Sequence, residues 1–299
     1  MAHRQQGGGI CQPDGDPAGH ARLHRGARGE RHRAWFGAHP RQGTDLGCPL
    51  EHRVLIERTR ANIAAAYLEL ARPVPGVHVV RDQQPLVVMG PGQPSFANFL
   101  MEFDDAEALV RAEAALRTIE VPSTIWAFHT DADRAPDLSG QLREHGFRRM
   151  SRLLCMVAEP EATSSESDFT WEPATRPADR DTVAAFMVRQ FFGNTDRQAQ
   201  AGIQLGTSKS VHSLYATPSV SRMTGGVMIV RSEGMGGLYC LCVHPDHQGK
   251  GLGGQIVRAV RREVHPDPVM LQCDATLERW YQALGFRTFG HVDAYCRDR

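Results

Sequence analysis

The segment that most constrains how this chain folds is VHPDHQGKGLGG, at residues 243–254. An apolar run at 238–243 leads into it, and the helix-like stretch QIVRAVRREV follows it. A strand that ends in a glycine-rich loop at a helix N-terminus leaves several backbone N–H groups without an internal acceptor. Such groups, with the positive end of the helix dipole behind them, bind phosphate, and glycines let the anion approach closely. The segment therefore predicts either a phosphate-binding loop or a tight connection between a strand and a helix.

The order of residues in the loop narrows this choice. Gln248, Gly251 and Gly253 form the pattern Gln-x-x-Gly-x-Gly, directly after a strand that ends in Val-His-Pro-Asp. This order resembles the coenzyme A pyrophosphate loop of the GNAT family of N-acetyltransferases. The segment YQALGF at 281–286 then stands where that family usually carries Tyr-x-x-Leu-Gly-Phe. The loop is not a Walker motif, because no Ser or Thr follows a Gly-Lys pair, and its glycine spacing differs from the Rossmann fingerprint.

The resemblance implies a reaction and a set of binding residues. The reaction is transfer of an acetyl group from the cosubstrate acetyl-CoA to a primary amine of a small molecule or peptide. The loop would bind the pyrophosphate mainly through backbone donors, while Lys250 either adds a charge near the phosphates or remains a solvated lysine. The preceding strand would pair with the pantetheine amides, and a backbone N–H around Val243 would polarise the thioester carbonyl. The implied binding residues are Leu241, Cys242, Val243, Gln248, Gly249, Lys250, Gly251, Leu252, Gly253 and Gly254.

Tyr281 is the side chain that the resemblance marks as catalytic. In relatives with this motif, the tyrosine at this position protonates the departing thiolate. A thiol pKa near 8.5 and a phenol pKa near 10 make complete transfer uphill by roughly 2 kcal/mol. A hydrogen bond to the thiolate, which becomes a transfer when water is excluded, is therefore the expected role. The structural alternative is a core tyrosine that packs the last helix.

The sequence does not identify the group that deprotonates the amine. A lysine-like amine with a pKa near 10.4 costs about 4.6 kcal/mol to neutralise at pH 7. Many relatives place a glutamate on the strand before the glycine loop, but residues 239–242, YCLC, contain no carboxylate. Glu233 and His212 are the remaining candidates, and deprotonation through ordered water is the default. His244 and His247 are expected in a surface turn rather than at a metal.

Composition excludes several other classes of protein. The chain has 299 residues, 41% of them hydrophobic, and a formal net charge of zero, so it can form sizeable cores but has no global field for nucleic acid or membranes. No apolar stretch is long enough to span a bilayer, and the N-terminus lacks the apolar core of a signal peptide. The seven cysteines form no CxxC pair, which favours free thiols in a reducing cytoplasm over a disulfide scaffold. We expect a cytoplasmic monomer or homodimer without a metal.

The order of predicted elements repeats along the chain. Helix-then-Gly-Phe segments recur at the same place in that order, as REHGF at 143–147 and QALGF at 282–286. The predicted fold is α+β, with two GNAT-like acyl-CoA N-acyltransferase domains, each a mixed, mostly antiparallel sheet flanked by helices. The predicted boundaries are an extension at 1–52, a degenerate GNAT-like domain at 53–158, a linker at 159–168 and an acetyl-CoA-binding domain at 169–299.

Several segments of the first half leave more than one interpretation open. The segment at 1–52 is rich in Gly, Arg, His and Pro, which indicates a disordered extension or a translation start placed too early, with a metal-binding or nucleic-acid tail as the alternative. The acidic DDAE at 104–107 replaces a glycine loop, and its charges would repel a pyrophosphate. Asn98, Trp126 and His129 are candidates to face a cleft between the halves and touch the acceptor, with strand packing as the alternative for Trp126. The alternative function is a non-catalytic coenzyme A-binding sensor or regulator, which the missing carboxylate favours.

Overall fold

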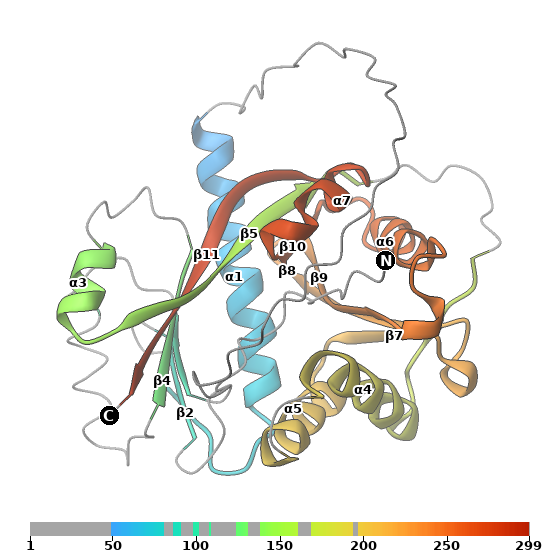
Figure 1. Cartoon of the computed structure of the whole chain (residues 1–299), viewed down its shortest axis with the longest axis horizontal. Coiled ribbons are helices and arrows are strands. Elements are labelled where there is room, and N and C mark those ends of the chain that lie inside the picture. Colours follow the sequence, from blue (N-terminus) through green and yellow to red (C-terminus); the bar gives the residue numbers. More distant parts are fainter. Residues whose placement is uncertain are drawn as a thin grey trace, which may run out of the picture.

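One mixed sheet runs through both halves of the chain. The computed structural model describes residues 49–80, 86–90, 98–101, 108, 124–130, 138–160, 169–193 and 197–298. Within these residues, 11 strands form a single sheet in the order β1-β2-β3-β4-β11-β5-β10-β9-β8-β7-β6 (Figure 1). The strands are β1 (His78–Val80), β2 (Leu86–Met89), β3 (Phe99–Met101), β4 (Thr124–Thr130), β5 (Arg148–Ala158), β6 (Glu172–Pro173), β7 (Ser213–Thr217), β8 (Gly225–Ser232), β9 (Met235–Val243), β10 (Val269–Cys273) and β11 (Arg287–Asp298).

Helices cover both faces of this sheet. They are α1 (Pro49–Ala71), α3 (Leu138–Glu144), α4 (Pro177–Phe192), α5 (Arg197–Lys209), α6 (Leu252–Glu263) and α7 (Glu278–Gln282), with the short 3-10 helices η2 (Val220–Arg222), η3 (Pro245–His247) and η4 (Ala275–Leu277). Side chains of β8 alternate between the faces, because Met228 and Val230 pack in the cluster of α1 and α4 whereas Val227 and Ile229 pack beneath α6. This alternation gives the sheet two apolar cores.

The two halves exchange their closing strands. In the first half β3 and β4 run parallel, and in the second half β9 and β10 do. The strand that closes the first half, β5, lies between β10 and β11, and the strand that closes the second half, β11, lies between β5 and β4. The sequence predicts a separate sheet for each half, but this exchange joins the strands into one. Antiparallel pairs can form between any two complementary strands, so the local pattern does not determine the partner.

Most predicted elements form where the apolar pattern places them. The main helix without a predicted counterpart is α5, whose sequence RQAQAGIQLGTSK is polar and contains two glycines. One of them, Gly206, faces α1, where a Cβ would collide with the carbonyl oxygen of Leu70. Tertiary packing thus overrides weak helix propensity. The acidic segment 104–107, residues 1–48 of the predicted extension and most of the predicted linker lie outside the described residues.

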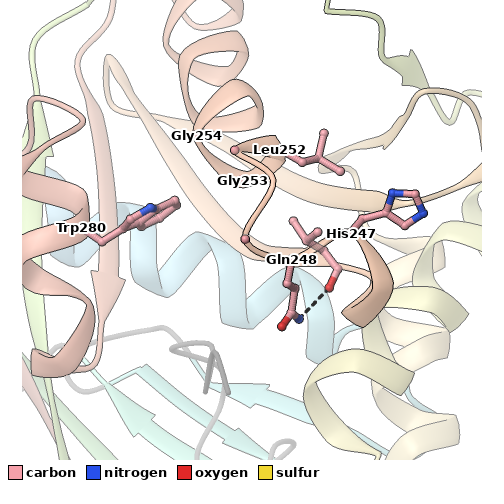
Figure 2. A pocket seen from close by; sticks show the side chains of 9 residues that line it. His247, Gln248, Leu252, Gly253, Gly254 and Trp280 are labelled. Atoms are coloured by element: carbon pink, nitrogen blue, oxygen red, sulfur yellow. Dashed lines mark hydrogen bonds between the residues drawn. The ribbon is translucent and has the colours of Figure 1, made fainter. Parts of the chain in front are cut away.

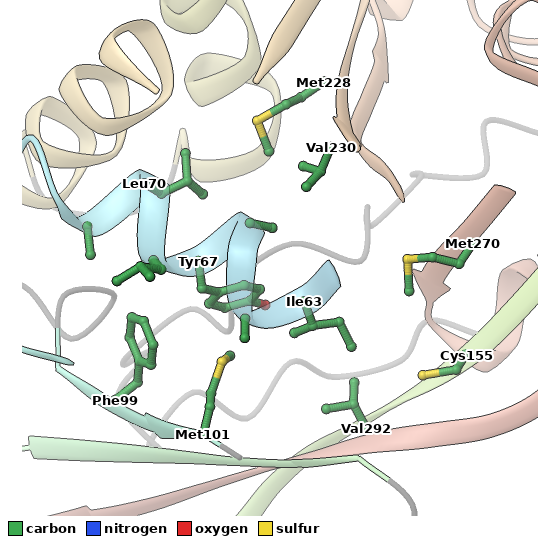
Figure 3. Close-up of a cluster of buried hydrophobic side chains, with 14 of the residues drawn as sticks. Ile63, Tyr67, Leu70, Phe99, Met101, Cys155, Met228, Val230, Met270 and Val292 are labelled. Carbon is green, nitrogen blue, oxygen red and sulfur yellow. The ribbon is translucent and has the colours of Figure 1, made fainter. Parts of the chain in front are cut away.

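Helix α1 is tied to the second half through Asn62. This side chain is fully buried, and its amide donates to the carbonyls of Val230 (3.1 Å) and Met235 (3.3 Å). Its oxygen accepts a hydrogen bond from the hydroxyl of Tyr239 (3.0 Å). Figure 3 shows α1 between β8 and β10 of the second half and strands of the first half, with Tyr67 in the apolar cluster. α1 therefore belongs to the core of both halves.

We expect Asn62→Leu to destabilise the protein by about 3 kcal/mol, because buried carbonyls and a hydroxyl would lose their partner. Urea denaturation would measure the change in the free energy of unfolding. Thr59→Val is the matched control, since Thr59 is equally buried on the same helix but only contacts the sulfur of Met235 (3.7 Å). Equal stability losses in the two variants would show that the Asn62 hydrogen bonds contribute little.

Candidate functional site

The glycine-rich loop forms the connection between β9 and α6. After Val243, the 3-10 helix η3 turns the chain, and the N–H of Gln248 donates to the carbonyl of Pro245 (3.2 Å). Gly249 and Gly251 then adopt φ angles of +74° and +80°. Residues with a side chain enter this region only at a cost, so the backbone of the loop requires glycine at both positions.

The N-terminus of α6 opens on a pocket. The first backbone bond of the helix runs from the N–H of Gln255 to the carbonyl of Gly251 (3.2 Å), so the N–H groups before it are those that a helix leaves without an internal acceptor. A Cβ atom on Gly249 or Gly251 would meet nothing within 4 Å, which means that both glycines border open space. The pocket measures about 300 Å³ and lies beside the loop (Figure 2). Its lining residues are Val243, His247, Gln248, Gly249, Gly251, Leu252, Gly253, Gly254 and Trp280.

This arrangement suits the phosphate groups of a coenzyme. The free N–H groups and the helix dipole attract negative charge, and the missing side chains leave room for oxygen atoms close to the backbone. The volume lies at the lower end of the range for small-molecule pockets. The residues present therefore fit a pyrophosphate, and pyrophosphate binding at this loop stays a prediction.

The side chains of Gln248 and Lys250 hold the loop. The amide nitrogen of Gln248 donates to the carbonyl of Val243 (3.0 Å), which ties the loop back to the end of β9 (Figure 2). The ammonium group of Lys250 donates to the carbonyl of Asp246 (2.6 Å). Its positive charge thus stays next to the loop backbone.

Strands β9 and β10 run parallel and then separate. Their backbone pairs end at Leu238 and Leu271, although β9 continues to Val243. Just beyond the last pair, Cys240 has a φ of +50°, and the register between β9 and β8 shifts. A bulge of this kind bends a strand. Among the strands that the structure describes, none pairs with the β10 side of residues 239–243.

Val243 directs its backbone toward that open edge. The N–H of the next residue, His244, donates to the carbonyl of Thr224 (2.7 Å), on the β8 side. Consecutive residues of a strand point their N–H groups to opposite edges, so the N–H of Val243 points away from β8. A ligand along this edge would meet a backbone donor at Val243, the position that the sequence predicts for it.

The side chains of the two preceding residues belong to the core. Cys242 is buried with its Sγ 3.6 Å from the carbonyl oxygen of Gly226, and burial raises the pKa of its thiol well above the ordinary value. Leu241 is half-buried and packs against the cluster beneath α6. A ligand could therefore contact these residues through their backbone.

Tyr281 lies in the core beside the pocket. Its side chain is 6% exposed, and its ring packs edge-on against Trp280 and Phe286, with centroid distances of 4.6 and 5.6 Å. Burial raises the pKa of its phenol, and the neighbouring Cys273 raises it further. The hydroxyl therefore keeps its proton at neutral pH, as a proton donor must. The catalytic role of Tyr281 stays a prediction.

Neither candidate base lies at the loop. Glu233 and Gly234 form the turn between β8 and β9, so Glu233 is at the opposite end of β9 from Val243. At the usual rise of a strand, that separation is about 30 Å. His212 is 6% exposed against α1, near the backbone of Ala66, and burial lowers the pKa of its imidazole. The group that deprotonates an amine stays unassigned.

The candidates in the first half are not brought to the pocket by the described geometry. Asn98 is 1% exposed, and its side-chain oxygen accepts a hydrogen bond from the N–H of Gly90 (2.8 Å), which gives it a structural role. Trp126 and His129 have their backbone in β4, but their side chains lie outside the described part of the chain.

Two residues that line the pocket were not among the predicted binding residues. His247 lies at the end of η3, and Trp280 lies on α7, directly before Tyr281 (Figure 2). Adjacent residues of a helix point about 100° apart, so a motif that marks Tyr281 does not indicate where Trp280 points. The rotation of about 100° per residue would have indicated that Trp280 and Tyr281 face different surroundings.

The described residues contain no group of three His, Cys, Asp or Glu side chains that could hold a metal ion. The rings of His244 and His247 lie 6.2 Å apart in the turn of η3. None of the five cysteines in the described residues forms a disulfide; they are Cys155, Cys240, Cys242, Cys273 and Cys296. None of the helices in the described residues is long and apolar enough to cross a membrane.

Comparisons with known proteins agree with this geometry. Residues 214–288 match the profile of the acetyltransferase (GNAT) domain. The matched region runs from β7 to the start of β11 and contains the loop, the pocket and the separation of β9 from β10. No curated protein matches the chain.

Solved structures resemble the chain over most of its length. A GCN5-related N-acetyltransferase from Kribbella flavida has a TM-score of 0.54 at 13% identity, over 78% of this chain and 95% of that one. A functionally unknown protein from Staphylococcus epidermidis has a TM-score of 0.54 at 16% identity, over 76% and 95%. A tandem GNAT protein from the clavulanic acid biosynthesis pathway has a TM-score of 0.51 at 10% identity, over 83% and 94%. At such identities the likeness concerns the fold alone, and it shows that this chain has a GNAT-like α+β fold. The profile match places a GNAT acetyltransferase domain within this fold at residues 214–288.

Proposed function

We propose that the chain transfers an acetyl group from acetyl-CoA to a primary amine of a small molecule or peptide. The observation that carries this proposal is the junction of two features at the end of β9. An open helix N-terminus with glycines at positive φ provides a place for the pyrophosphate, and the unpaired edge of β9 provides a place for the pantetheine arm. Val243 links the two, because it lines the pocket and ends the strand.

In this proposal the backbone binds and polarises, and side chains play a smaller part. The N–H groups of the loop and of the first turn of α6 would bind the phosphates, and Lys250 would add a nearby charge. The N–H of Val243 would donate to the thioester oxygen as negative charge develops on it. The neutral amine nitrogen, whose ammonium form has lost a proton to water, then forms a bond to the carbonyl carbon. The carbon–sulfur bond breaks, and the nitrogen releases a second proton to water as the amide forms. Tyr281 would stabilise the departing thiolate by a hydrogen bond or by proton transfer.

The first half is proposed to be a degenerate GNAT-like domain at 53–158 that supports the second at 169–299. Its support comes from topology, since in both halves a parallel pair of strands is followed by a closing strand that crosses to the other half. The Gly-Phe segments of the internal repeat directly precede β5 and β11 in the sequence. The two exchanged strands would therefore be corresponding elements of the two halves.

A non-catalytic coenzyme A-binding sensor is the second candidate. It is favoured by the location of the candidate bases, because Glu233 lies at the far end of β9 and His212 is buried against α1. The experiment that separates the two functions is a screen of primary amines with acetyl-CoA, in which release of free coenzyme A thiol is measured. We expect amine-dependent release with at least one acceptor. Tight binding of acetyl-CoA without release for any amine in a broad panel would favour the sensor.

The first expected outcome is one coenzyme A bound per chain. The glycine loop occurs only after β9, and the corresponding position of the first half carries the acidic segment 104–107 in the sequence. Titration calorimetry should give a stoichiometry near one, and the loop variant described next should weaken binding at that one site. A value near two would show that the first half also binds the coenzyme.

Gly251→Val should weaken coenzyme A binding by about tenfold or more, because valine resists a positive φ and its side chain would enter the space available to the anion. Gly76→Val is the matched control, since Gly76 has a φ of +76° and equally open surroundings after α1, away from the pocket. Calorimetry would measure affinity, and thermal denaturation would measure stability. Similar stability losses with unchanged affinity in both variants would mean that the loop is only a turn.

Tyr281→Phe should lower the rate of acetyl transfer roughly 10²- to 10⁴-fold, the usual contribution of a positioned acid. The affinity for coenzyme A should change far less, because the proposed coenzyme contacts are made by the backbone. Single-turnover rates with an acceptor from the amine screen would measure the effect.

Tyr215→Phe is the control for this substitution. Tyr215 also packs in the cluster beneath α6, but its hydroxyl donates to Glu263 (2.9 Å) at the far end of that helix. Full turnover in Tyr281→Phe would mark Tyr281 as a core residue. A joint loss of affinity and melting temperature would assign it a structural role and leave the thiolate without a partner.

A further inference from the structure

Trp280 forms the aromatic wall of the pocket. It is half-buried and lines the pocket, whereas its neighbour Tyr281 turns into the core. Figure 2 shows its indole on α7, across the pocket from His247 and next to Gly253 at the start of α6. The indole is held at a steep angle of 70° to the ring of Tyr281. The indole therefore contacts a core ring while it lines the pocket.

The wall and the end of β9 both approach the first turn of α6. A Cβ placed on Gly253 would lie 3.3 Å from Cζ2 of Trp280 and 3.9 Å from a methyl group of Val243. The indole and Val243 thus both lie next to Gly253 in the first turn of α6. A ligand chain that runs from the N–H groups of α6 to the edge of β9 starts in the pocket that this apolar surface lines.

We propose that Trp280 is a coenzyme-binding residue whose indole packs against the pantetheine arm where that arm leaves the pyrophosphate. The inference rests on the proposed function and extends it to specificity. The arm carries a branched, apolar carbon segment at this point, and burial of apolar surface against an aromatic ring is favourable. The backbone N–H groups bind any phosphate, so Trp280 selects a phosphate that bears an apolar chain over a bare nucleotide.

Gly253 leaves room for the indole of Trp280. The distance of 3.3 Å between its Cβ position and Trp280 is tighter than ordinary contact, so any side chain there would displace the indole. Glycine at 253 therefore serves the position of Trp280, in addition to the approach of the anion. A substitution at Gly253 would therefore shift the indole of Trp280 without removing it.

The test compares two ligands in Trp280→Ala. The dissociation constant for coenzyme A should rise about tenfold or more, the loss expected when an aromatic contact is removed. The dissociation constant for adenosine 3′,5′-bisphosphate, which has phosphates but no pantetheine arm, should change less than twofold. Equal changes for both ligands, or none, would overturn the proposal.

Tryptophan fluorescence gives an independent readout that needs no acceptor. Coenzyme A should change the emission of the native protein and of Trp171→Phe, but not of Trp280→Phe. Trp171 is the matched control because it stacks on Tyr215 (4.1 Å, 18°), whose hydroxyl binds the last residue of α6, away from the pocket. A response that persists in Trp280→Phe would place the contact elsewhere.

A double-mutant cycle tests the link to Gly253. Gly253→Ala should weaken coenzyme A binding in the native background and have a much smaller effect in Trp280→Ala, since the indole that it displaces is absent. Equal effects in both backgrounds would show that Gly253 acts without Trp280. A native protein that binds no coenzyme A at all would overturn the proposed function itself, which is a different result from native binding that survives loss of the indole.

Discussion

The separation of β9 from β10 after Leu238 is the constraint on which the candidate site depends. The first residue of β9 beyond the last pair, Tyr239, donates its hydroxyl to Asn62 of α1, and the next residue, Cys240, forms the bulge. Gly237 allows this, because a Cβ there would collide with the side chain of Asn62. A hydrogen-bond network centred on the buried Asn62 thus holds the strand on one side of its distortion, and the free edge that follows is a fixed feature rather than a frayed end.

The exchange of β5 and β11 makes each half depend on the other. β5 pairs with both β10 and β11, so residues 169–299 alone would leave those strands without the one between them. Arg152 of β5 reinforces this pairing through two bonds of 2.7 Å to Asp293 of β11. Burial of Asp293 would raise the pKa of its carboxyl, but the hydrogen bonds and charge of Arg152 outweigh that effect and hold the pKa below the ordinary value. A boundary drawn at 159–168 therefore separates the sequence halves without separating the sheet.

The sequence predicts what local chemistry determines. The loop at 248–253 is readable because glycines at positive φ, a preceding apolar strand and a following helix are all adjacent in the chain. Partners that lie far apart in the sequence are not readable in this way, and the exchanged closing strands and the contact of Gly206 with α1 are examples. Side-chain direction is a third limit, since a turn of about 100° between neighbours decides that Trp280 faces the pocket and Tyr281 the core.

The strand that leads to the loop also restricts how the proposed reaction could begin. Burial raises the pKa of Tyr239 well above its ordinary value and that of Cys240 to about 12, so both keep their protons at neutral pH and cannot take one from an amine. If the amine loses its proton to water, only the fraction of the acceptor that is already neutral in solution can react. At pH 7 that fraction is about one in ten for an α-amino group with a pKa near 8, and about one in 2500 for a lysine side chain. Burial keeps the side chains of Tyr239 and Cys240 protonated, so neither can serve as the base. The pKa of the acceptor amine therefore becomes part of the specificity of the proposed reaction.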